Sequence, residues 1–256
     1  MTGLPERFLR LPIAHRALHD LDDGRPENSV AAARAAVAAG YGIEVDVQLT
    51  ADDFAAVFHD YSLDRLTGET GPLRQRTMDE LQAINLADSQ ETIPSLAQVL
   101  AAVDGQVPVL VELKDQDGAM GPGIGALEQA VADDIAASSN EVAVMSFNPH
   151  SVARLQELAP QVPRGLITGA FQGGNWGLVP EKVRARLRDI PDFARTGASF
   201  VSHGVADLDR ARLKELKGRG VPVLCWTVRD AVTEANARQI ADNITFEGYL
   251  PAIPPA

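Results

Sequence analysis

The feature that most constrains the fold of this chain is a regular alternation of short apolar runs with helix-like segments. Strands that alternate with helices indicate βαβ units and a mainly parallel sheet. About eight such units within 256 residues favour a closed (β/α)8 barrel, or TIM barrel, over an open doubly wound sheet. Segment 29–40 is a typical helix of the series, with Asn28 as its expected N-cap and Gly40 as its expected end. The strand-like runs are residues 11–16, 42–48, 54–59, 107–114, 141–147, 164–168, 199–203 and 221–228.

Two stretches depart from this simple α/β alternation. Runs 42–48 and 54–59 are joined only by "LTADD", which is too short for a parallel crossover, so we expect these two strands to be antiparallel. A further run at 243–251 would then complete the barrel. Residues 60–92 have the least regular pattern and indicate a small insertion. No domain boundary is visible, so residues 1–256 are expected to form a single domain.

Charge and composition exclude several functional classes. The formal net charge of −12 argues against a nucleic-acid-binding protein, which would show a basic face. An anionic substrate would therefore be attracted by a local feature, such as a metal ion or clustered arginine and lysine. No secretory signal is visible, and no apolar run approaches the roughly 20 residues that cross a bilayer. Because the single cysteine, Cys225, can form no internal disulfide, we expect a cytoplasmic protein without stable membrane association. An oligomer is compatible with all of these features.

Three acidic residues stand where a TIM barrel places its catalytic groups, at the carboxyl ends of strands. Glu44 and Asp46 are two residues apart in run 42–48, so their side chains point to the same face. Glu112 lies at the end of run 107–114. Neighbouring carboxylates repel each other unless a cation or a shared proton compensates, and an all-oxygen set suits Mg²⁺ or Ca²⁺. A solvated polar face is the alternative for Glu44 and Asp46 alone, and the third carboxylate favours the metal site.

Two histidines also stand at the ends of apolar runs. His15 ends the first run and His59 ends the third. Imidazole titrates near neutral pH, so such a pair can divide the roles of general acid and general base; a pair of hydrogen-bonded structural histidines is the alternative. Arg16 and Lys114 lie beside these groups and are candidates for binding an anion. Salt bridges to carboxylates such as Glu27 are the competing interpretation for both cations.

The order of these motifs resembles the glycerophosphodiester phosphodiesterase family. The motifs that carry the resemblance are "HRALHD" with "PENS", "IEVDVQLT" with "VFHD", "VELK", and "CWTV". The similarity is dense over residues 11–66, resumes at 107–114 and 141–147, and ends at 221–228. As an ordered set, these motifs are far more specific than any one of them alone.

The resemblance implies a TIM barrel of the phospholipase-C-like phosphodiesterase type. It also implies metal-dependent hydrolysis of glycerophosphodiesters to glycerol 3-phosphate and an alcohol, with one divalent cation, Mg²⁺ or Ca²⁺, as the cofactor. Two alternatives stay open: phospholipase-D-like hydrolysis of lysophospholipids, and a non-catalytic barrel that binds phosphodiesters. The implied metal ligands are Glu44, Asp46 and Glu112, the implied acid/base pair is His15 and His59, and the implied substrate-binding residues are Arg16, Glu27, Lys114 and Trp226.

Three features bear on how closely the chain follows this family. The family usually has glycine after the His-Arg pair, where this chain has Ala17; alanine fits there if the backbone φ is negative. The family usually ends with an I-x-T-D-x-P pattern, and this chain has "ITFEGYLP", in which Glu247 could take over part of the role of the aspartate. The glycine-rich segment 169–180 could form a lid over the alcohol part of the substrate or be a plain surface loop.

Overall fold

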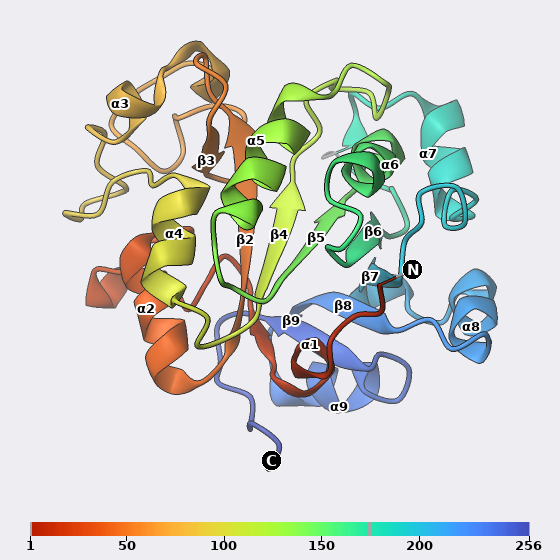
Figure 1. The fold of residues 1–256 in the computed structure, drawn as a ribbon. Helices are drawn as coiled ribbons and strands as arrows, with labels where there is room; N and C mark the ends of the chain where they lie inside the picture. Colours follow the sequence, from red (N-terminus) through yellow and green to blue (C-terminus); the bar gives the residue numbers. More distant parts are fainter. Residues whose placement is uncertain (1, 174–175, 256) are drawn as a thin grey trace.

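The structure, a computed structural model, describes residues 2–173 and 176–255. Within these residues, eight parallel strands close into a barrel, because β1 pairs with β2 on one side and with β9 on the other. The predicted TIM barrel is thus confirmed (Figure 1), including its completion by the strand of run 243–251. The barrel strands are β1 (Ile13–Ala14), β2 (Gly42–Leu49), β4 (Val109–Leu113), β5 (Val142–Ser146), β6 (Arg164–Thr168), β7 (Phe200–Gly204), β8 (Val223–Val228) and β9 (Asn243–Phe246).

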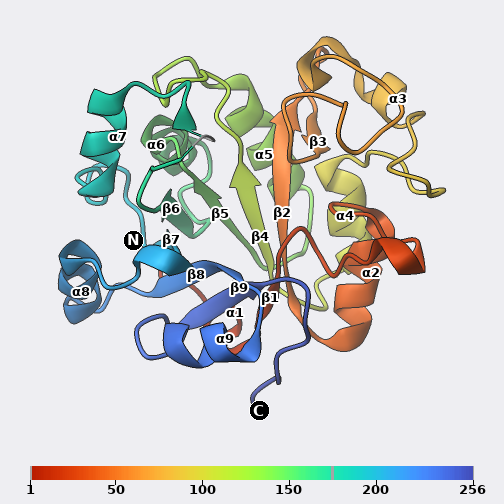
Figure 2. The same ribbon diagram turned by 180° about the vertical axis from the view of Figure 1, so that it is seen from behind.

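Helices surround the barrel on its outer side (Figures 1 and 2). Among the described residues, no helix has both the length and the apolar composition that a membrane span requires. The α-helices are α1 (Glu6–Arg10), α2 (Val30–Ala39), α3 (Met78–Leu81), α4 (Leu96–Val103), α5 (Ala126–Ala136), α6 (Pro149–Leu158), α7 (Glu181–Arg188), α8 (Ala211–Gly218) and α9 (Ala231–Ala237), and short 3₁₀ helices are η1 (Leu21–Asp23), η2 (Leu73–Gln75) and η4 (Val205–Asp207).

The predicted antiparallel pair is also confirmed. Strand β3 (Ala55–Val57) runs antiparallel to the upper part of β2 and lies outside the closed barrel. The irregular insertion follows it and packs beside β3 at the end of the barrel to which the carboxyl ends of β2 and β4 point (Figure 1). Its apolar side chains, among them Leu63, Leu73 and Leu86, form a buried cluster with Ala56 and Phe58. The insertion is therefore a packed subdomain at the rim of the barrel mouth.

Side chains on the barrel strands alternate between two environments. Along β2, Ile43, Val45 and Val47 belong to the apolar layer between the barrel and its helices. Glu44 and Asp46, at the alternate positions, are turned into the barrel, as the two-residue side-chain period of a strand requires. An all-apolar outer face with carboxylates on the inner face is stable only if the inner charges find partners, because an unpaired buried charge is costly.

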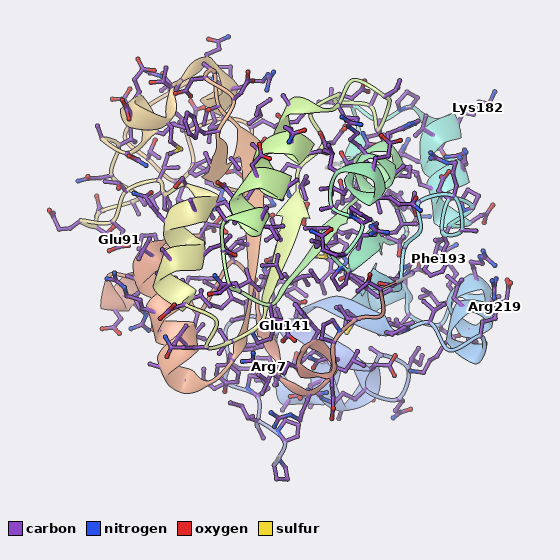
Figure 3. All side chains as sticks on the ribbon, viewed as in Figure 1. Arg7, Glu91, Glu141, Lys182, Phe193 and Arg219 are labelled. Atoms are coloured by element: carbon purple, nitrogen blue, oxygen red, sulfur yellow. The ribbon has the colours of Figure 1, made fainter. Side chains whose placement is uncertain are left out.

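The end of the barrel opposite the carboxylates is closed by apolar packing. Helix α1 lies across it (Figure 1), and Phe8 of this helix joins Ile13, Leu110 and Phe200 in the inner apolar cluster. Figure 3 shows Arg7 and Glu141 beside each other at this end, and they form an ion pair at 3.6 Å. The barrel interior is thus apolar at one end and charged at the other, which leaves a single mouth for chemistry.

Candidate active site

Three acidic side chains meet at the mouth of the barrel. Asp46 of β2 and Glu112 of β4 are register partners, and Glu44 precedes Asp46 on the same face of β2. Each residue has a carboxylate oxygen within 4.8 Å of one from each of the others, and all three side chains are buried. The structure therefore brings together the three residues that the sequence predicted as metal ligands.

Lysine and arginine side chains compensate only part of this negative charge. The Nζ of Lys114 donates to Asp46 Oδ1 at 3.2 Å and to Glu112 Oε1 at 2.8 Å. Burial opposes the charge of Lys114, but the two carboxylates outweigh it and raise the pKa of the ammonium group. Burial also raises the pKa of Glu44, and the like charges of Asp46 and Glu112 raise it further. Glu44 is therefore the member of the cluster that most lacks a cation.

The carboxylate cluster fits a divalent cation. The Oε1 atom of Glu44 is buried and, among the described residues, has no hydrogen-bond partner. A buried carboxylate oxygen without a partner costs free energy, and a cation bound there would remove that cost. The donors are all carboxylate oxygens, which Mg²⁺ and Ca²⁺ prefer over nitrogen or sulfur. Glu44, Asp46 and Glu112 would hold such an ion.

The expectation that Asn28 caps the helix over 29–40 is wrong. Ser29 is the N-cap of α2, and its hydroxyl accepts the backbone N–H of Ala32. Asn28 instead has a left-handed backbone, with φ of 61°, and its side chain turns into the site. Its Nδ2 donates to Asp46 Oδ2 at 3.0 Å, and its Oδ1 accepts the backbone N–H of Asp46 at 3.2 Å. Asn28 therefore orients a candidate metal ligand.

Ala17 does not have the negative φ under which alanine fits without strain. Its φ is 64°, and Arg16 before it has φ of 55°. This left-handed turn lets the Arg16 N–H donate to Glu44 Oε2 at 2.9 Å, while the Ala17 N–H donates to the Glu44 carbonyl at 2.8 Å. The backbone thus takes a conformation that glycine adopts freely, because it positions Glu44, and the Cβ of Ala17 is strained.

A pair of glycine substitutions tests this strain. Ala14 and Ala17 are both buried, and only Ala17 has a positive φ. Each change to glycine removes one buried methyl group and adds the same freedom to the unfolded chain, but only Ala17→Gly relieves a left-handed alanine. In urea unfolding, Ala17→Gly should therefore cost at least about 1 kcal/mol less stability than Ala14→Gly. Equal losses at the two positions would show that position 17 is unstrained.

His15 is held by a carboxylate from the other end of the chain. Its Nδ1 lies 2.5 Å from Oε2 of Glu247, the residue that follows β9, and Oε1 of Glu247 pairs with Arg229 at 2.5 Å. The hydrogen bond from His15 outweighs burial and lowers the pKa of Glu247 to about 2, so this carboxylate is ionised at neutral pH. It keeps Nδ1 of His15 protonated and presents Nε2 for proton transfer.

His59 is held in the same way by its neighbour in the sequence. Its Nδ1 lies 2.6 Å from Asp60 Oδ1, and Asp60 Oδ2 accepts the Nε–H of Arg65 at 2.5 Å. Burial alone would raise the pKa of Asp60, but the hydrogen bonds from His59 and Arg65 hold it below its usual range. Both candidate acid/base histidines are therefore backed by an ionised carboxylate and an arginine.

The two candidate phosphate-binding cations make the ion pairs that were the competing interpretation. The Nη1 of Arg16 donates to Glu27 Oε1 at 2.8 Å, and its Nε lies 3.6 Å from Asp46 Oδ2. Burial would raise the pKa of Glu27, but the hydrogen bond from Arg65 and the charge of Arg16 lower it. Together with the bonds of Lys114, these contacts fix two cations beside the carboxylate cluster, where an anionic group would meet them.

Aromatic side chains cluster at β8 and just beyond the carboxyl ends of β5 and β6, and we call this cluster the aromatic wall. Trp226 of β8 donates its Nε1–H to the carbonyl of Ser202 at 3.2 Å. Its ring lies edge-to-face with Phe147, at 5.5 Å between centroids, and Phe147 in turn contacts Trp176 at 5.0 Å. Trp176 belongs to the segment 169–180, of which residues 174 and 175 lie outside the described residues. The described part of that segment thus contributes to the aromatic wall.

Several site residues were not singled out by the sequence. Arg65 and Arg229 were missed altogether, Asn28 was assigned to a helix cap, and Asp60 entered only as the last residue of the motif "VFHD". Arg65 lies in the irregular insertion, where no periodic pattern points to a direction for its side chain. Only the pairing of a charged residue with a histidine, as in "HD", could have suggested Asp60.

Comparison with known proteins identifies the family. The model of the glycerophosphoryl diester phosphodiesterase family matches residues 15–245, which is most of the chain. The chain belongs to this family. The match runs from the candidate catalytic His15 into strand β9 of this phosphodiesterase-family protein. It includes the three acidic residues and both histidines of the site, and Glu247 lies just beyond it.

Individual relatives agree with this membership. YhdW of Bacillus subtilis, named as a provisional glycerophosphodiester phosphodiesterase, is 31% identical over 233 residues, which are 87% of this chain and 88% of the relative. Glycerophosphodiester phosphodiesterase 1 of Bos taurus is 29% identical over 84% of this chain and 71% of its own length. A phosphodiesterase from Oleispira antarctica, solved with its product sn-glycerol-3-phosphate, has the same fold, with a TM-score of 0.75 at 22% identity and 93% coverage of both chains.

Proposed function

We propose that this member of the glycerophosphoryl diester phosphodiesterase family hydrolyses glycerophosphodiesters to glycerol 3-phosphate and an alcohol, with one divalent cation, Mg²⁺ or Ca²⁺. The observation that carries the proposal is the buried cluster of Glu44, Asp46 and Glu112. Two histidines, each bonded to a carboxylate, lie close enough to this cluster to lower the pKa of Asp46. The family membership and the product complex of the Oleispira antarctica relative support the same reaction class.

The two histidines supply the proton transfers of the proposed reaction. Because Glu247 and Asp60 occupy the Nδ1 atoms, each imidazole acts through Nε2. One of the two histidines, His15 or His59, accepts the proton of the attacking nucleophile, and the other donates a proton to the oxygen of the leaving alcohol. The nucleophile is either water, which gives glycerol 3-phosphate directly, or the glycerol 2-hydroxyl, which gives a cyclic phosphate that water then opens. General acid and base catalysis of this kind contributes about 10²- to 10⁴-fold to a rate.

Positively charged groups bind the phosphate. Arg16 offers two parallel N–H donors that match a phosphate, and Lys114 offers a compact ammonium charge. Glu27 holds Arg16 in place. A cation bound by the carboxylate cluster would neutralise part of the phosphate charge and stabilise negative charge that develops on oxygen. In this proposal, Trp226 and the aromatic wall take the organic part of the substrate.

The cellular setting is proposed on separate grounds. The substrates named here are the deacylated head-group diesters of phospholipids, which connects the protein with lipid metabolism. A single cysteine, buried as a free thiol in β8, supports a reducing, cytoplasmic location. The net charge of −12 supports a small-molecule substrate rather than nucleic acid. The barrel closed by β1 and β9 supports a single catalytic domain over residues 1–256.

A substrate comparison tests the proposed function. The protein is incubated with glycerophosphocholine and, separately, with lysophosphatidylcholine, each with Mg²⁺, with Ca²⁺ and with excess chelator. We expect glycerol 3-phosphate to be released from glycerophosphocholine only when a metal is present. Turnover of lysophosphatidylcholine alone would favour the phospholipase-D-like alternative. Absence of metal-dependent turnover with both substrates would favour a non-catalytic barrel and overturn the proposal.

A further inference from the structure

Arg65 connects two parts of the candidate site that lie on different segments of the chain. It belongs to the insertion after β3, near the rim of the barrel mouth. Its Nε–H donates to Asp60 Oδ2 at 2.5 Å. Its Nη1 and Nη2 donate to the two carboxylate oxygens of Glu27 at 3.0 and 2.7 Å. One guanidinium group thus binds two carboxylates at once, and one of them is bound through both of its oxygens.

Each of these carboxylates holds a candidate functional residue. Asp60 accepts from Nδ1 of His59 at 2.6 Å, and Glu27 accepts from Nη1 of Arg16 at 2.8 Å. A continuous series of hydrogen bonds therefore runs from the candidate acid/base histidine, through Arg65, to the candidate phosphate-binding arginine. A lysine could not reproduce this arrangement, because its single nitrogen lacks the planar fork that binds two groups in fixed directions.

The burial of the partners makes these contacts more than a surface ion pair. The side chain of Arg65 is 47% exposed, but those of Glu27 and Asp60 are only 12% and 24% exposed. Isolated exposed salt bridges contribute little, whereas bidentate geometry and networks of several charges are the exceptions. Without Arg65, Asp60 and Glu27 would each lose a cation that holds them beside His59 and Arg16.

The equivalent contact at the other histidine is simpler. Arg229 pairs with Glu247, which holds His15, but its side chain is 61% exposed and the structure gives it no second carboxylate among the described residues. Both histidines thus have a carboxylate and an arginine behind them. Only Arg65 also reaches the residue that holds the phosphate-binding arginine.

We propose that Arg65 is a positioning residue that sets the orientation of His59 and of Arg16 together. A single side chain from the insertion thus aligns the acid/base histidine with the phosphate-binding arginine. This inference rests on the proposed function for the roles of the two residues that Arg65 positions. It assigns the insertion a part in the active site, because Arg65 connects it through Glu27 to Arg16 at the barrel mouth.

Steady-state kinetics can measure separately the contact of Arg65 with Asp60 and its contact with Glu27. Loss of hydrogen bonds to charged groups at this site should change each constant by about tenfold or more. Arg65→Gln should lower kcat and raise KM for glycerophosphocholine. Asp60→Asn breaks the connection to His59 and should mainly lower kcat, whereas Glu27→Gln breaks the connection to Arg16 and should mainly raise KM. Arg65→Lys should restore only part of either constant.

Two controls distinguish positioning from a general loss of structure. Arg76 lies in the same insertion and pairs only with Glu69 among the described residues, so Arg76→Gln should leave both constants within about twofold of the wild type. Combining Arg65→Gln with Asp60→Asn should lower kcat no further than about threefold below the Asp60→Asn value, because both changes break one connection. The inference would be overturned if the double variant lost kcat by the product of the two single losses. It would also be overturned if Arg65→Gln kept the kcat and KM of the wild type.

A spectroscopic measurement tests the positioning without any turnover. The chain has five histidines, and the resonances of His59 can be assigned with a His59→Gln variant. In ¹⁵N-labelled protein, long-range proton–nitrogen correlation should show the Nδ1–H tautomer of neutral His59, and Arg65→Gln and Arg65→Lys should both shift it toward a mixture. An unchanged tautomer in both variants would overturn the inference. If the wild type has no phosphodiesterase activity, the proposed function fails, and this measurement alone decides whether Arg65 positions His59.

Discussion

Replacing His15 by alanine should lower kcat for glycerophosphocholine by about 10²- to 10⁴-fold, the range that general acid or base catalysis contributes. The physical reason is the environment of the ring. The ionised Glu247 carboxylate, whose pKa is lowered to about 2, keeps Nδ1 protonated and leaves Nε2 to exchange a proton with the substrate. Alanine removes that nitrogen and so removes the proton-transfer group that Glu247 holds in place.

Two controls are needed: one shows that His15→Ala is folded, and the other shows that replacing a histidine outside the site does not lower kcat. Circular dichroism and the melting temperature of His15→Ala should stay close to those of the wild type, because the ring is at the mouth rather than in the apolar core. His150, in the first turn of α6, makes no side-chain hydrogen bond or ion pair among the described residues, and His150→Ala should retain full kcat. Glu247→Gln should lower kcat by less than His15→Ala, since the imidazole stays but loses its orienting charge. Full activity in His15→Ala would remove this residue from the mechanism.

Glu44→Gln should abolish the metal response of the protein and yet stabilise the metal-free form. Glu44 is buried beside Asp46 and Glu112, and like charges at this distance repel each other strongly in a low-dielectric interior. Glutamine has the same shape and can still accept the backbone N–H of Arg16, so the local turn is kept. Removing one of three negative charges lowers the repulsion, but it also removes a ligand for the cation.

Thermal unfolding with and without metal shows both effects. In excess chelator, Glu44→Gln should melt at a higher temperature than the wild type. With Mg²⁺ or Ca²⁺, the wild type should gain stability in proportion to the logarithm of ion concentration above its dissociation constant, and the variant should gain far less. Activity of the variant should fall at least about 100-fold, as loss of a ligand at a catalytic metal implies.

The same substitution at an exposed glutamate is the control for Glu44→Gln. Glu157 is 68% exposed in its side chain and pairs only with Arg154 among the described residues, so Glu157→Gln should match the wild type with and without metal. If Glu44→Gln gains as much stability from the ion as the wild type does, Glu44 is not a ligand. If Glu44→Gln melts at a lower temperature than the wild type in chelator, charge repulsion does not dominate the stability of the metal-free cluster.

Local sequence patterns were enough to predict the barrel and the core of the site. The spacing of Glu44 and Asp46 on a strand put both on one face, and the period of two that sends them inward also sends Ile43 and Val45 outward to the helices. The short "LTADD" link was enough to predict the antiparallel pair. These inferences succeed because strand geometry is local and repeats along the chain.

The positions of supporting residues depended on segments far apart in the sequence. Asn28 follows the local rule for a helix cap, but its side chain bonds Asp46 instead. Ser29 caps α2, which leaves the Asn28 side chain free to bond the carboxylate. Ala17 has a left-handed φ that no local pattern requires. In both cases contact with β2 outweighed the local preference of the residue.

The sequence by itself determined the fold class, the three converging carboxylates and the two histidines, because the strand period and the closure of a parallel barrel bring the carboxyl ends of its strands to one mouth. Only the tertiary structure decided how each histidine is held: by Glu247 from the last strand and by Asp60 through Arg65 of the insertion. Charge pairing of this kind is set by distances of a few ångströms between segments, and the order of residues along a chain does not encode such distances directly.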